Sequence, residues 1–545
     1  MEVFYFYVMK SPILIIATLL WFACNPQKQQ KISKIPNAQW LLFTDTLPAK
    51  EIAGNFNTPS NFVFDSTAIQ LFLQTYPSFR PFKLELQKFY RKRNFAYAWH
   101  LPTGLIEQSY ILYNNILQSE DNGLFQDIPY ADAYKKMMEE NNSENLIFRE
   151  LMITNQYINY AKQVLTGIPE AGSKQLEWFI PRKKLNYTEL IDTLIKNKFN
   201  LPNKLYYPQY GKLKEKLHFF YSLEKNHSWP IIILERKRYK LGDTSTAILN
   251  VRKKLLLLGD LTSNNNSDIF DTELLNGVKQ FQSRYGLTQD GIIGKTVIEK
   301  LNQPISNSIK QIIINMERCR WLPNETDKDY LVVNIPEFKL YVHEKDEISF
   351  SCNVVVGKST NKTVIFRGIM QNIVFAPYWN IPPDILSKEI LPAISRDPNY
   401  LSNHNMEWSN GKLRQKPGPQ NALGKVKFIF PNSYNIYLHD TPSKSLFSAD
   451  RRAFSHGCIR VSEPLKLALF LLRNDSSWNE NKILSAMESN QEKYITLRNR
   501  VPVYVIYLTS FVDEKGKINF REDMYNRDEK LKEMLFSKNQ EKLIK

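Results

Sequence analysis

The spacing of apolar residues along the first half of the chain is that of helices. Over residues 62–238, apolar positions recur at intervals of three and four, which is typical of amphipathic helices. Within residues 68–99 the pattern is interrupted at Pro77 and at Pro81, and residues 146–167 predict a long helix that ends at a glycine. Residues 62–238 are therefore predicted to form a largely helical domain, in which no catalytic constellation is recognisable.

Residues 239–303 have a shorter helical pattern and predict a separate small unit. An amphipathic segment follows a turn, and two further helical segments are joined by a tight turn at Asp290 and Gly291. Seven apolar side chains are expected to fill one small core: Leu249, Leu255, Leu274, Val278, Phe281, Leu287 and Leu301.

From residue 329 the period changes to that of strands. Apolar positions alternate, or run together with β-branched residues, in five segments, which are residues 330–344, 348–358, 425–431, 434–440 and 501–513. We therefore predict a β-rich domain over residues 304–510, followed by a C-terminal tail over residues 511–545. The whole chain is predicted to be a multidomain α+β protein.

A long insertion interrupts this β-rich domain at residues 376–425. It is rich in Pro, Asn and aromatic residues, and residues 384–394 predict a helix within it. An insertion of this length in a compact sheet domain is usually functional or disordered. The helix and the aromatic residues favour an ordered lid.

The N-terminus has the pattern of an export signal. An eleven-residue run, 13–23, that is apolar except for Thr18 follows Lys10 and ends before Cys24. It is too short for a stable membrane span but typical of a signal peptide. A small residue before the cysteine resembles a lipoprotein signal, although Trp21 departs from it. We predict a signal peptide over residues 1–24, lipidation at Cys24, a tether over residues 25–61 and a membrane-anchored periplasmic protein; an uncleaved short anchor is the alternative.

Charge and cysteine content narrow the chemistry. The 545 residues include 72 Lys and Arg against 55 Asp and Glu, so the net charge of +17 favours anionic partners. The basic residues stand in short runs without a nucleic-acid motif, so nucleic acid is not expected as a partner. Export leaves Cys319, Cys352 and Cys458, an odd number in an oxidising compartment, so at least one thiol stays unpaired within the chain. Cys319 and Cys352 are expected to be core thiols, and a disulfide between them stays open.

The remaining cysteine lies in a cluster that suggests catalysis. His456 precedes Cys458 by two positions, which on a strand places both side chains on one face. His439 ends an upstream apolar segment and would approach the sulfur if the two segments are neighbouring strands. A thiol ionises only near pH ~8.5, whereas a neighbouring imidazole can accept its proton and pair with the thiolate. Gly457 permits close approach of a substrate, and the amides of Gly457 and Cys458 could bind an oxyanion. The plainer alternative is a buried thiol beside two structural histidines.

Several motifs carry a resemblance to a known family. The segments HDTP at residues 439–442 and SHGCIR at residues 455–460 resemble the signature of L,D-transpeptidases with the YkuD catalytic fold. Residues 315–323, 377–385, 414–428 and 518–528, among others, resemble the large periplasmic members of the YcbB type. Residues 239–303 resemble a three-helix peptidoglycan-binding module through Phe281, Gln282, Gly286, Leu287, Asp290, Gly291, Gly294 and Thr296. The resemblance extends over the chain after the tether.

The resemblance implies roles for individual residues. Cys458 would be the nucleophile and His439 the general base, oriented by the backbone carbonyl of Asp440 and not by its carboxylate. The pocket would be shaped by Ser455, His456, Gly457 and Arg460, with Tyr437 binding the oxyanion or a substrate carboxylate. Arg460 replaces the Asn of shorter members but suits the large ones. In the lid, the candidate substrate contacts are Trp379, Arg414 and Asn421.

The same resemblance implies a reaction, and several alternatives stay open. Cys458 would attack the third residue of a tetrapeptide stem, release D-Ala, and pass the acyl group to the amine of another stem in a 3→3 cross-link. Peptidoglycan and the membrane are the expected partners, residues 62–238 are a candidate site for other wall-synthesis proteins, and no cofactor or metal is expected. Hydrolysis by an L,D-carboxypeptidase, exchange with D-amino acids or a lipoprotein, a non-catalytic wall-binding scaffold, and a cysteine peptidase are the alternatives.

Overall fold

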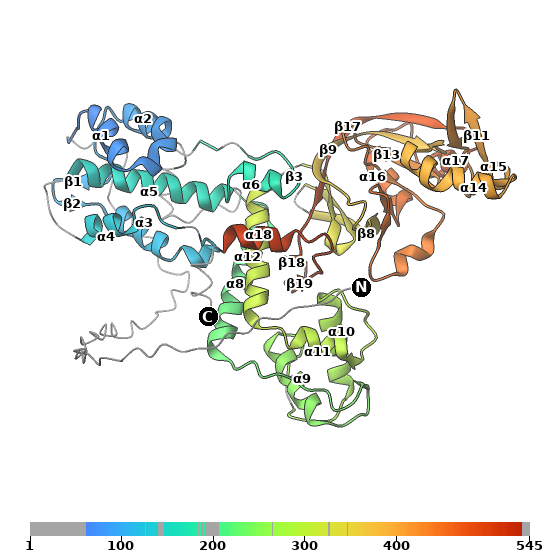
Figure 1. The fold of residues 1–545 in the computed structure, drawn as a ribbon, viewed down its shortest axis with the longest axis horizontal. Helices are drawn as coiled ribbons and strands as arrows, with labels where there is room; N and C mark the ends of the chain where they lie inside the picture. The colour runs from blue at the N-terminus through green and yellow to red at the C-terminus, as the bar shows by residue number, and fades with distance from the viewer. Residues whose placement is uncertain are drawn as a thin grey trace, which may run out of the picture. The chain divides into compact units, whose positions relative to one another are not determined.

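The computed structural model describes much of the chain between residues 62 and 536 (Figure 1). The predicted signal peptide, Cys24 and the predicted tether lie outside the described residues. The internal gaps are residues 126, 140–145, 184, 187–189, 191–205, 264, 325–327 and 346. Among the helices that are described, none is both long and apolar enough to span a membrane.

The helical domain is built around α5 (Leu146–Thr166), which contacts α1, α2, α3 and α4. As predicted, α5 ends at Gly167, whose φ of +66° reverses the chain, and the two prolines convert the pattern between α1 and α2 into a 3₁₀ turn. The other elements here are α1 Thr67–Thr75, η1 Pro77–Phe82, α2 Lys83–Lys92, β1 His100–Leu101, β2 Gly104–Leu105, α3 Glu107–Leu117, η2 Ser119–Asn122, α4 Ala131–Glu139, α6 Glu170–Gln175, β3 Trp178–Phe179 and α8 Gln209–Asn226.

The predicted three-helix unit is present as α9 (Thr246–Leu257), α10 (Thr272–Arg284) and α11 (Lys295–Leu301), with the short pair β4 (Arg238–Tyr239) and β5 (Ile293–Gly294). Ser245 caps α9 and Asp271 caps α10, each by accepting a backbone N–H bond. Five of the seven predicted core side chains are buried, whereas Leu287 is half-buried. The prediction for Leu249 is wrong, because the buried face of α9 is instead formed by Ile248, Val251 and Leu255.

The β-rich domain is one sheet that closes on itself. Its strand order is β13–β14–β16–β8–β7–β6–β17–β9, and β13 also pairs with β9. Near the start of β9, on the edge that β13 also uses, the two-residue strand β3 of the helical domain pairs with β9 in parallel. The strands are β6 Tyr330–Asn334, β7 Lys339–Glu344, β8 Glu347–Gly357, β9 Ile365–Phe375, β13 Val426–Ile429, β14 Leu438–His439, β15 Ala453–Ser455, β16 Ile459–Val461 and β17 Lys493–Ile506. The domain also contains two 3₁₀ turns, η5 Ile335–Glu337 and η7 Lys444–Ser448, and two helices, α16 Pro464–Leu472 and α17 Glu480–Met487.

The predicted strands are confirmed, but β9 and the three-residue strand β15 were not predicted. The longer of these two is β9. Its sequence, IFRGIMQNIVF, places a glycine and several polar residues where the alternation should be strongest. The glycine is required by packing, because a Cβ at Gly368 would lie 2.6 Å from the ring of Phe430.

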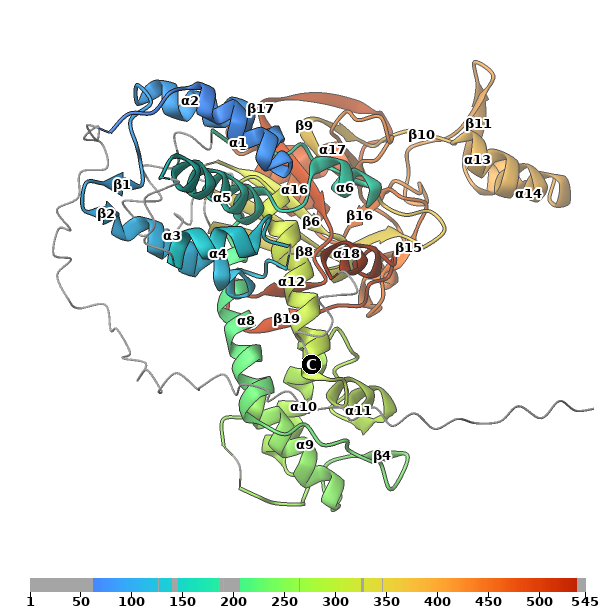
Figure 2. The same ribbon diagram turned by 60° about the vertical axis from the view of Figure 1, so that its left-hand side comes forward.

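The insertion is ordered, and Figure 2 shows its elements labelled β10, β11, α13 and α14. It has its own small core of Ile381, Ile390, Met406 and Leu413. The predicted helix is present, but it contains a π turn, in which the N–H of Leu391 bonds to the carbonyl of Leu386. Pro392 follows at once and has no N–H to continue an α-helical ladder. The elements are β10 Trp379–Asn380, α13 Pro383–Ile385, η6 Leu386–Ile390, α14 Leu391–Arg396, α15 Tyr400–Asn403, β11 Met406–Ser409 and β12 Lys412–Gln415.

Residues 510–536 are folded, so the prediction of a tail from residue 511 is wrong over this range. The segment forms β18 (Ser510–Val512), β19 (Ile518–Phe520) and α18 (Asp528–Leu535), and its apolar side chains are buried except for Met534. It joins the other parts of the chain, because Arg318 of α12 (Ile305–Trp321) pairs with Asp528 at 2.6 Å and Arg284 of α10 donates to the carbonyl of Ile518 at 2.6 Å.

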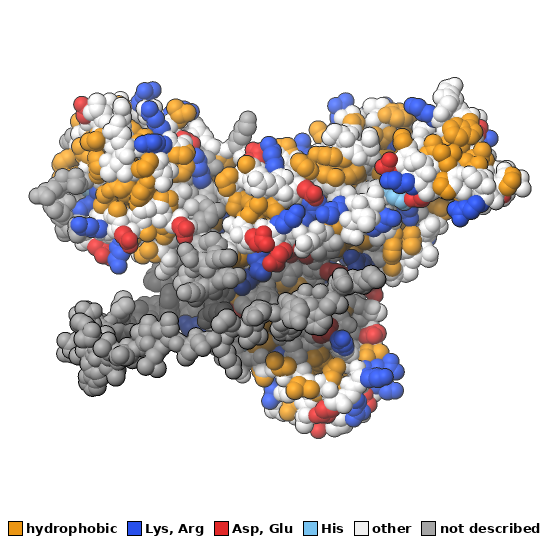
Figure 3. All heavy atoms as spheres, in the orientation of Figure 1, with side chains coloured by type: hydrophobic (Ala, Val, Ile, Leu, Met, Phe, Trp, Pro, Cys, Tyr) orange, Lys and Arg blue, Asp and Glu red, His pale blue; other side chains and the backbone are white. Residues whose placement is uncertain are grey.

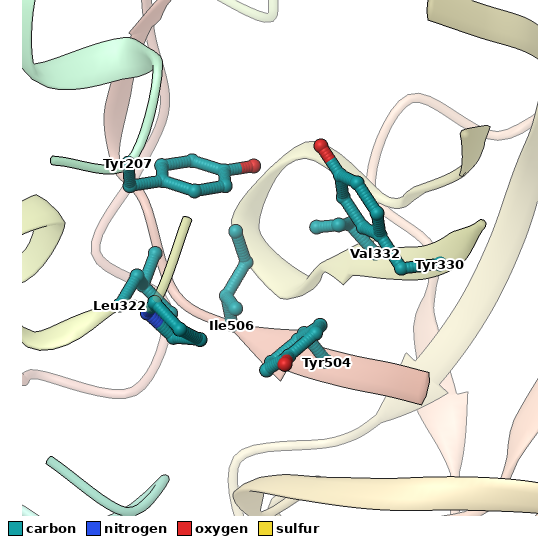
Figure 4. A pocket seen from close by; sticks show the side chains of 7 residues that line it. Tyr207, Leu322, Tyr330, Val332, Tyr504 and Ile506 are labelled. Atoms are coloured by element: carbon teal, nitrogen blue, oxygen red, sulfur yellow. The ribbon is translucent and has the colours of Figure 1, made fainter. Parts of the chain in front are cut away.

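A small cavity lies beside the sheet (Figure 4). Tyr207 and Leu322 face Tyr330 of β6 and Tyr504 of β17 across it. No charged side chain lines this cavity, and it contains none of the predicted site residues.

We expect the buried pair between Arg284 and Asp260 to matter for stability. Arg284→Ala would leave a carboxylate that is 5% exposed without its partner, which costs about 3–5 kcal/mol in comparable buried pairs. The unfolding transition in urea should shift to clearly lower concentration. Lys295→Ala removes an exposed cation from the same module and should change stability by less than about 0.5 kcal/mol. Equal shifts in both variants would contradict the assignment.

Candidate active site

Three neighbouring strands place three polar side chains on one face of the sheet. Lys427 of β13 lies opposite His439 of β14, and His439 lies opposite Arg460 of β16. Paired residues of neighbouring strands project to the same face. On the other face the paired residues Phe428, Leu438 and Ile459 are completely buried. Hydrophobic burial on one side therefore directs Lys427, His439 and Arg460 to the other.

The ring of His439 is held by a backbone carbonyl. Its Nδ1 donates to the carbonyl of Asp440 at 2.5 Å, which leaves Nε2 as the basic nitrogen. The Asp440 carboxylate is engaged elsewhere: it accepts the amide N–H of Lys425 at 2.9 Å and pairs with Lys444. This is the geometry that the resemblance implied for His439 and Asp440.

Cys458 directly precedes β16, beside the strand that carries His439. The amide of Ile459 donates to the carbonyl of Tyr437, and side chains alternate along each strand, so Cys458 and Tyr437 share the face of Arg460 and His439. The half-buried thiol donates weakly to the carbonyl of Asn435 at 3.6 Å. The rings of Tyr437 and His439 are 5.6 Å apart. Cys319 and Cys352 are buried free thiols.

The prediction that His456 and Cys458 share a strand face is wrong. Residues 456–458 form a bend between β15 and β16, in which Gly457 has a φ of +116°. Ser455 closes this bend, because its hydroxyl donates to the carbonyl of Cys458 at 2.6 Å and accepts the amide N–H of Gly457 at 3.1 Å. The Gly457 amide is thus engaged, and its predicted place in an oxyanion hole is not supported.

The electrostatics favour a neutral pair. Burial, and then the charges of Arg460 and Lys427, lower the pKa of His439 to about 3, against the opposing effect of the Asp440 carbonyl. Burial raises the pKa of Cys458, although hydrogen bonds from Tyr437 and the same two cations oppose this rise. The expected thiolate–imidazolium pair is therefore disfavoured in the free chain.

Two residues of the candidate site were not predicted from the sequence. Lys427 is half-buried, and its ammonium lies 3.9 Å from the ring centroid of Tyr437. The sequence feature that could have identified Lys427 is its position between Val426 and Phe428 in an otherwise apolar strand. The other is Glu389, whose carboxylate accepts a hydrogen bond from Nε2 of His456 at 2.8 Å.

The contact between Glu389 and His456 joins the insertion to the catalytic loop. Glu389 lies in the π turn of the insertion, whereas His456 directly precedes Gly457 in the bend. His456 is thus placed at the site, but as a link to the insertion. Its side chain is 39% exposed and that of Glu389 is 52% exposed, so this link is open to solvent.

The three predicted lid contacts have structural roles. Asn421 is buried, and its amide donates to the carbonyls of Pro377 and Lys416, so it is not accessible to a substrate and that prediction is wrong. Arg414 pairs with Glu407 at 2.6 Å. Trp379 packs against the core of the insertion. A substrate role for Arg414 or Trp379 is therefore not supported by their contacts.

Charged side chains of both signs are mixed on one face of the described part of the molecule. On the face drawn in Figure 3, Lys and Arg side chains are scattered among acidic and apolar ones. That face therefore offers no continuous basic surface of the kind that tracks a nucleic-acid backbone.

Three segments of the chain match known domain families. Residues 328–482 match the L,D-transpeptidase catalytic domain, residues 84–217 match a scaffold domain, and residues 244–301 match a "Putative peptidoglycan binding domain". The chain thus carries an L,D-transpeptidase catalytic domain. Together with the other two domains, it has the composition that the sequence resemblance implied.

Relatives with the same domain are known. A "Putative L,D-transpeptidase" of Haemophilus influenzae is 30% identical over 247 residues, which are 42% of this chain and 50% of that protein. The chain therefore spans about half the length of this curated relative. Among solved structures, an L,D-transpeptidase from Stackebrandtia nassauensis is 15% identical and covers 50% of this chain and 97% of its own, with a TM-score of 0.23. One from Xylanimonas cellulosilytica is 14% identical and covers 50% and 100%, with a TM-score of 0.17. These scores are too low to bear on the fold.

We expect Glu389→Gln to loosen the insertion. The change weakens an exposed ion pair, which is worth at most about 1 kcal/mol, so deuterium uptake by residues 386–396 should rise by up to about fivefold. Asp384→Asn makes the same change of charge in the same insertion and should leave uptake there unaltered. Equal effects of the two variants would show that the contact with His456 does not hold the insertion.

Proposed function

We propose that the chain is an L,D-transpeptidase that forms 3→3 cross-links in peptidoglycan through a thioester on Cys458. The observation that carries the proposal is the position of Cys458 directly before β16, next to His439 of the adjacent strand β14. Nδ1 of His439 is bonded to the Asp440 carbonyl, and both residues lie inside the segment that matches an L,D-transpeptidase catalytic domain. The three-helix module suits a peptidoglycan substrate.

The first half-reaction is acylation. The Cys458 sulfur attacks the carbonyl on the L-centre of the third stem residue, and Nε2 of His439 takes the thiol proton. The tetrahedral oxyanion is bound by the Cys458 amide and the Tyr437 hydroxyl. Collapse breaks the C–N bond, and His439 returns the proton to the departing amine of D-Ala. The products are a thioester and free D-Ala.

The second half-reaction transfers the acyl group. The side-chain amine of a neighbouring stem attacks the thioester, loses its proton to His439, and expels the Cys458 thiolate, which His439 then protonates. The thioester conserves the energy of the broken amide, so no nucleotide is consumed. Water competes with the amine. The insertion, which is bonded to the site loop through Glu389 and His456, would limit the access of water.

We also propose that the chain acts in the periplasm and is anchored to a membrane by a lipid on Cys24. Tethering would raise the local concentration of both enzyme and wall polymer. The helical domain would position the catalytic domain or bind other wall-synthesis proteins.

The decisive experiment is incubation of the chain with tetrapeptide muropeptides, followed by mass analysis. We expect cross-linked dimers and D-Ala, and a loss of at least about 10³-fold in Cys458→Ala, because no other group replaces the nucleophile. Cys352→Ala removes a buried thiol and should retain activity. A carbapenem should add to the wild type and not to Cys458→Ala. Tripeptides without dimers would identify a carboxypeptidase, and dimers from Cys458→Ala would overturn the mechanism.

The pH dependence of the reaction follows from His439. Because its pKa is lowered to about 3, the imidazole stays neutral well below pH 6.5 and remains a proton acceptor there. We therefore expect kcat/KM, which reports the free enzyme, to hold between pH 7 and pH 5. A loss of half the activity near pH 6.5 would show that His439 titrates normally.

A further inference from the structure

Among the described residues, two cations beside Cys458 lack a carboxylate partner, whereas four buried arginines elsewhere in the chain each have one. Arg284, Arg318, Arg320 and Arg527 each pair with an Asp or Glu within 2.7 Å. Lys427 and Arg460 form no salt bridge among the described residues, and Nε of Arg460 is buried without a hydrogen-bond partner.

Leaving these charges unpaired has a cost. Half-buried cations lose hydration, and a missing partner leaves that loss uncompensated. Burial accordingly lowers the pKa of Lys427 and of Arg460. Glu492 attracts Lys427 without forming an ion pair with it. A site that keeps two such cations together is suited to an anion.

We infer that Lys427 and Arg460 form a carboxylate-binding subsite beside Cys458 that holds the terminal carboxylate of the leaving D-amino acid. The identity of this ligand rests on the proposed function, whereas the existence of an anion subsite does not.

The geometry of the strands supports this assignment. Cys458 and Arg460 are two residues apart on one face, a separation of roughly 7 Å along a strand. Lys427 approaches from the other side of β14, where the Tyr437 ring holds its ammonium at 3.9 Å. In a tetrapeptide stem the terminal carboxylate is separated from the scissile amide nitrogen by a single carbon. A carboxylate between the two cations therefore leaves the scissile carbonyl within reach of the sulfur.

The subsite would also couple recognition to catalysis. Arg460 and Lys427 both lower the pKa of His439, so in the free chain they weaken the base. A bound carboxylate offsets their charge and raises the basicity of His439 when the donor is in place. An uncharged molecule that enters the site would not produce this gain.

The first test compares two alkylating agents of equal size, anionic iodoacetate and neutral iodoacetamide, on the full chain. The readout is the ratio of their rates at Cys458, divided by the same ratio for free cysteine, with the modified peptide identified by mass. We expect this normalised ratio to be at least about tenfold above unity in the wild type. The ratio removes effects of accessibility and thiol ionisation that both reagents share.

Variants locate the subsite. Lys427→Met and Arg460→Met should each lower the normalised ratio several-fold toward unity, while both retain iodoacetamide labelling. Lys466→Met removes one exposed cation from α16 and should leave the ratio unchanged, which controls for net charge. A wild-type ratio near unity, or an equal loss in Lys466→Met, overturns the subsite whatever the enzyme does.

The second test concerns the ligand. Acylation of Cys458 by a tetrapeptide donor is compared with acylation by the same donor amidated at its C-terminus. We expect the carboxylate form to have a kcat/KM at least about tenfold higher, and Lys427→Met to abolish most of this preference. Equal rates for the two donors would overturn the assignment to the leaving group. A high alkylation ratio without acylation by either donor would uphold the anion subsite and refute the proposed function.

Discussion

The parallel pairing of β14 with β16 is the constraint on which the site depends. Strand β14 contains only Leu438 and His439, and it is held between β13 and β16. Burial of a large apolar side chain contributes about 1.5–3 kcal/mol, and Phe428, Leu438 and Ile459 are buried together on the core face. A slip of one residue would turn His439 into the core. Apolar packing behind the sheet therefore fixes the chemistry in front of it.

The spacing of the catalytic motif follows from this pairing. Parallel neighbours cannot be joined by a tight turn and need a crossover of a dozen or more residues. Residues 440–458 are that crossover, and they contain η7 and β15, which itself pairs with β8. The interval between His439 and Cys458 is thus the length of chain required to return beside β14. The three-helix module also contacts this crossover, because the Thr288 hydroxyl donates to Asp450 at 2.5 Å.

How far the sequence predicts this site depends on how local each interaction is. The hydrogen bond from His439 to the Asp440 carbonyl joins adjacent residues, so it can be predicted from the sequence motif alone. The apolar periodicity predicted most of the secondary structure but not β9. Gly368 interrupts the alternation in β9 because the ring of Phe430 leaves no room for a side chain there, and Phe430 is distant in the sequence. The Gly457 amide was wrongly predicted to be free for an oxyanion. Its hydrogen bond to the Ser455 hydroxyl forms only in the conformation of the bend, which the sequence does not reveal.

Lys427 and Glu389 could not be predicted for a different reason. Lys427 reaches the site through strand order, since β13 lies beside β14 in a sheet that closes through β9. Glu389 reaches His456 from an insertion with a separate core. In the proposed mechanism the motif residues carry out the reaction. Lys427 and Glu389 come from other elements, and the roles proposed for these elements are to bind the donor carboxylate and to limit the access of water. A catalytic motif therefore identifies the chemistry more readily than the substrate, because specificity is built from neighbours that only the completed fold supplies.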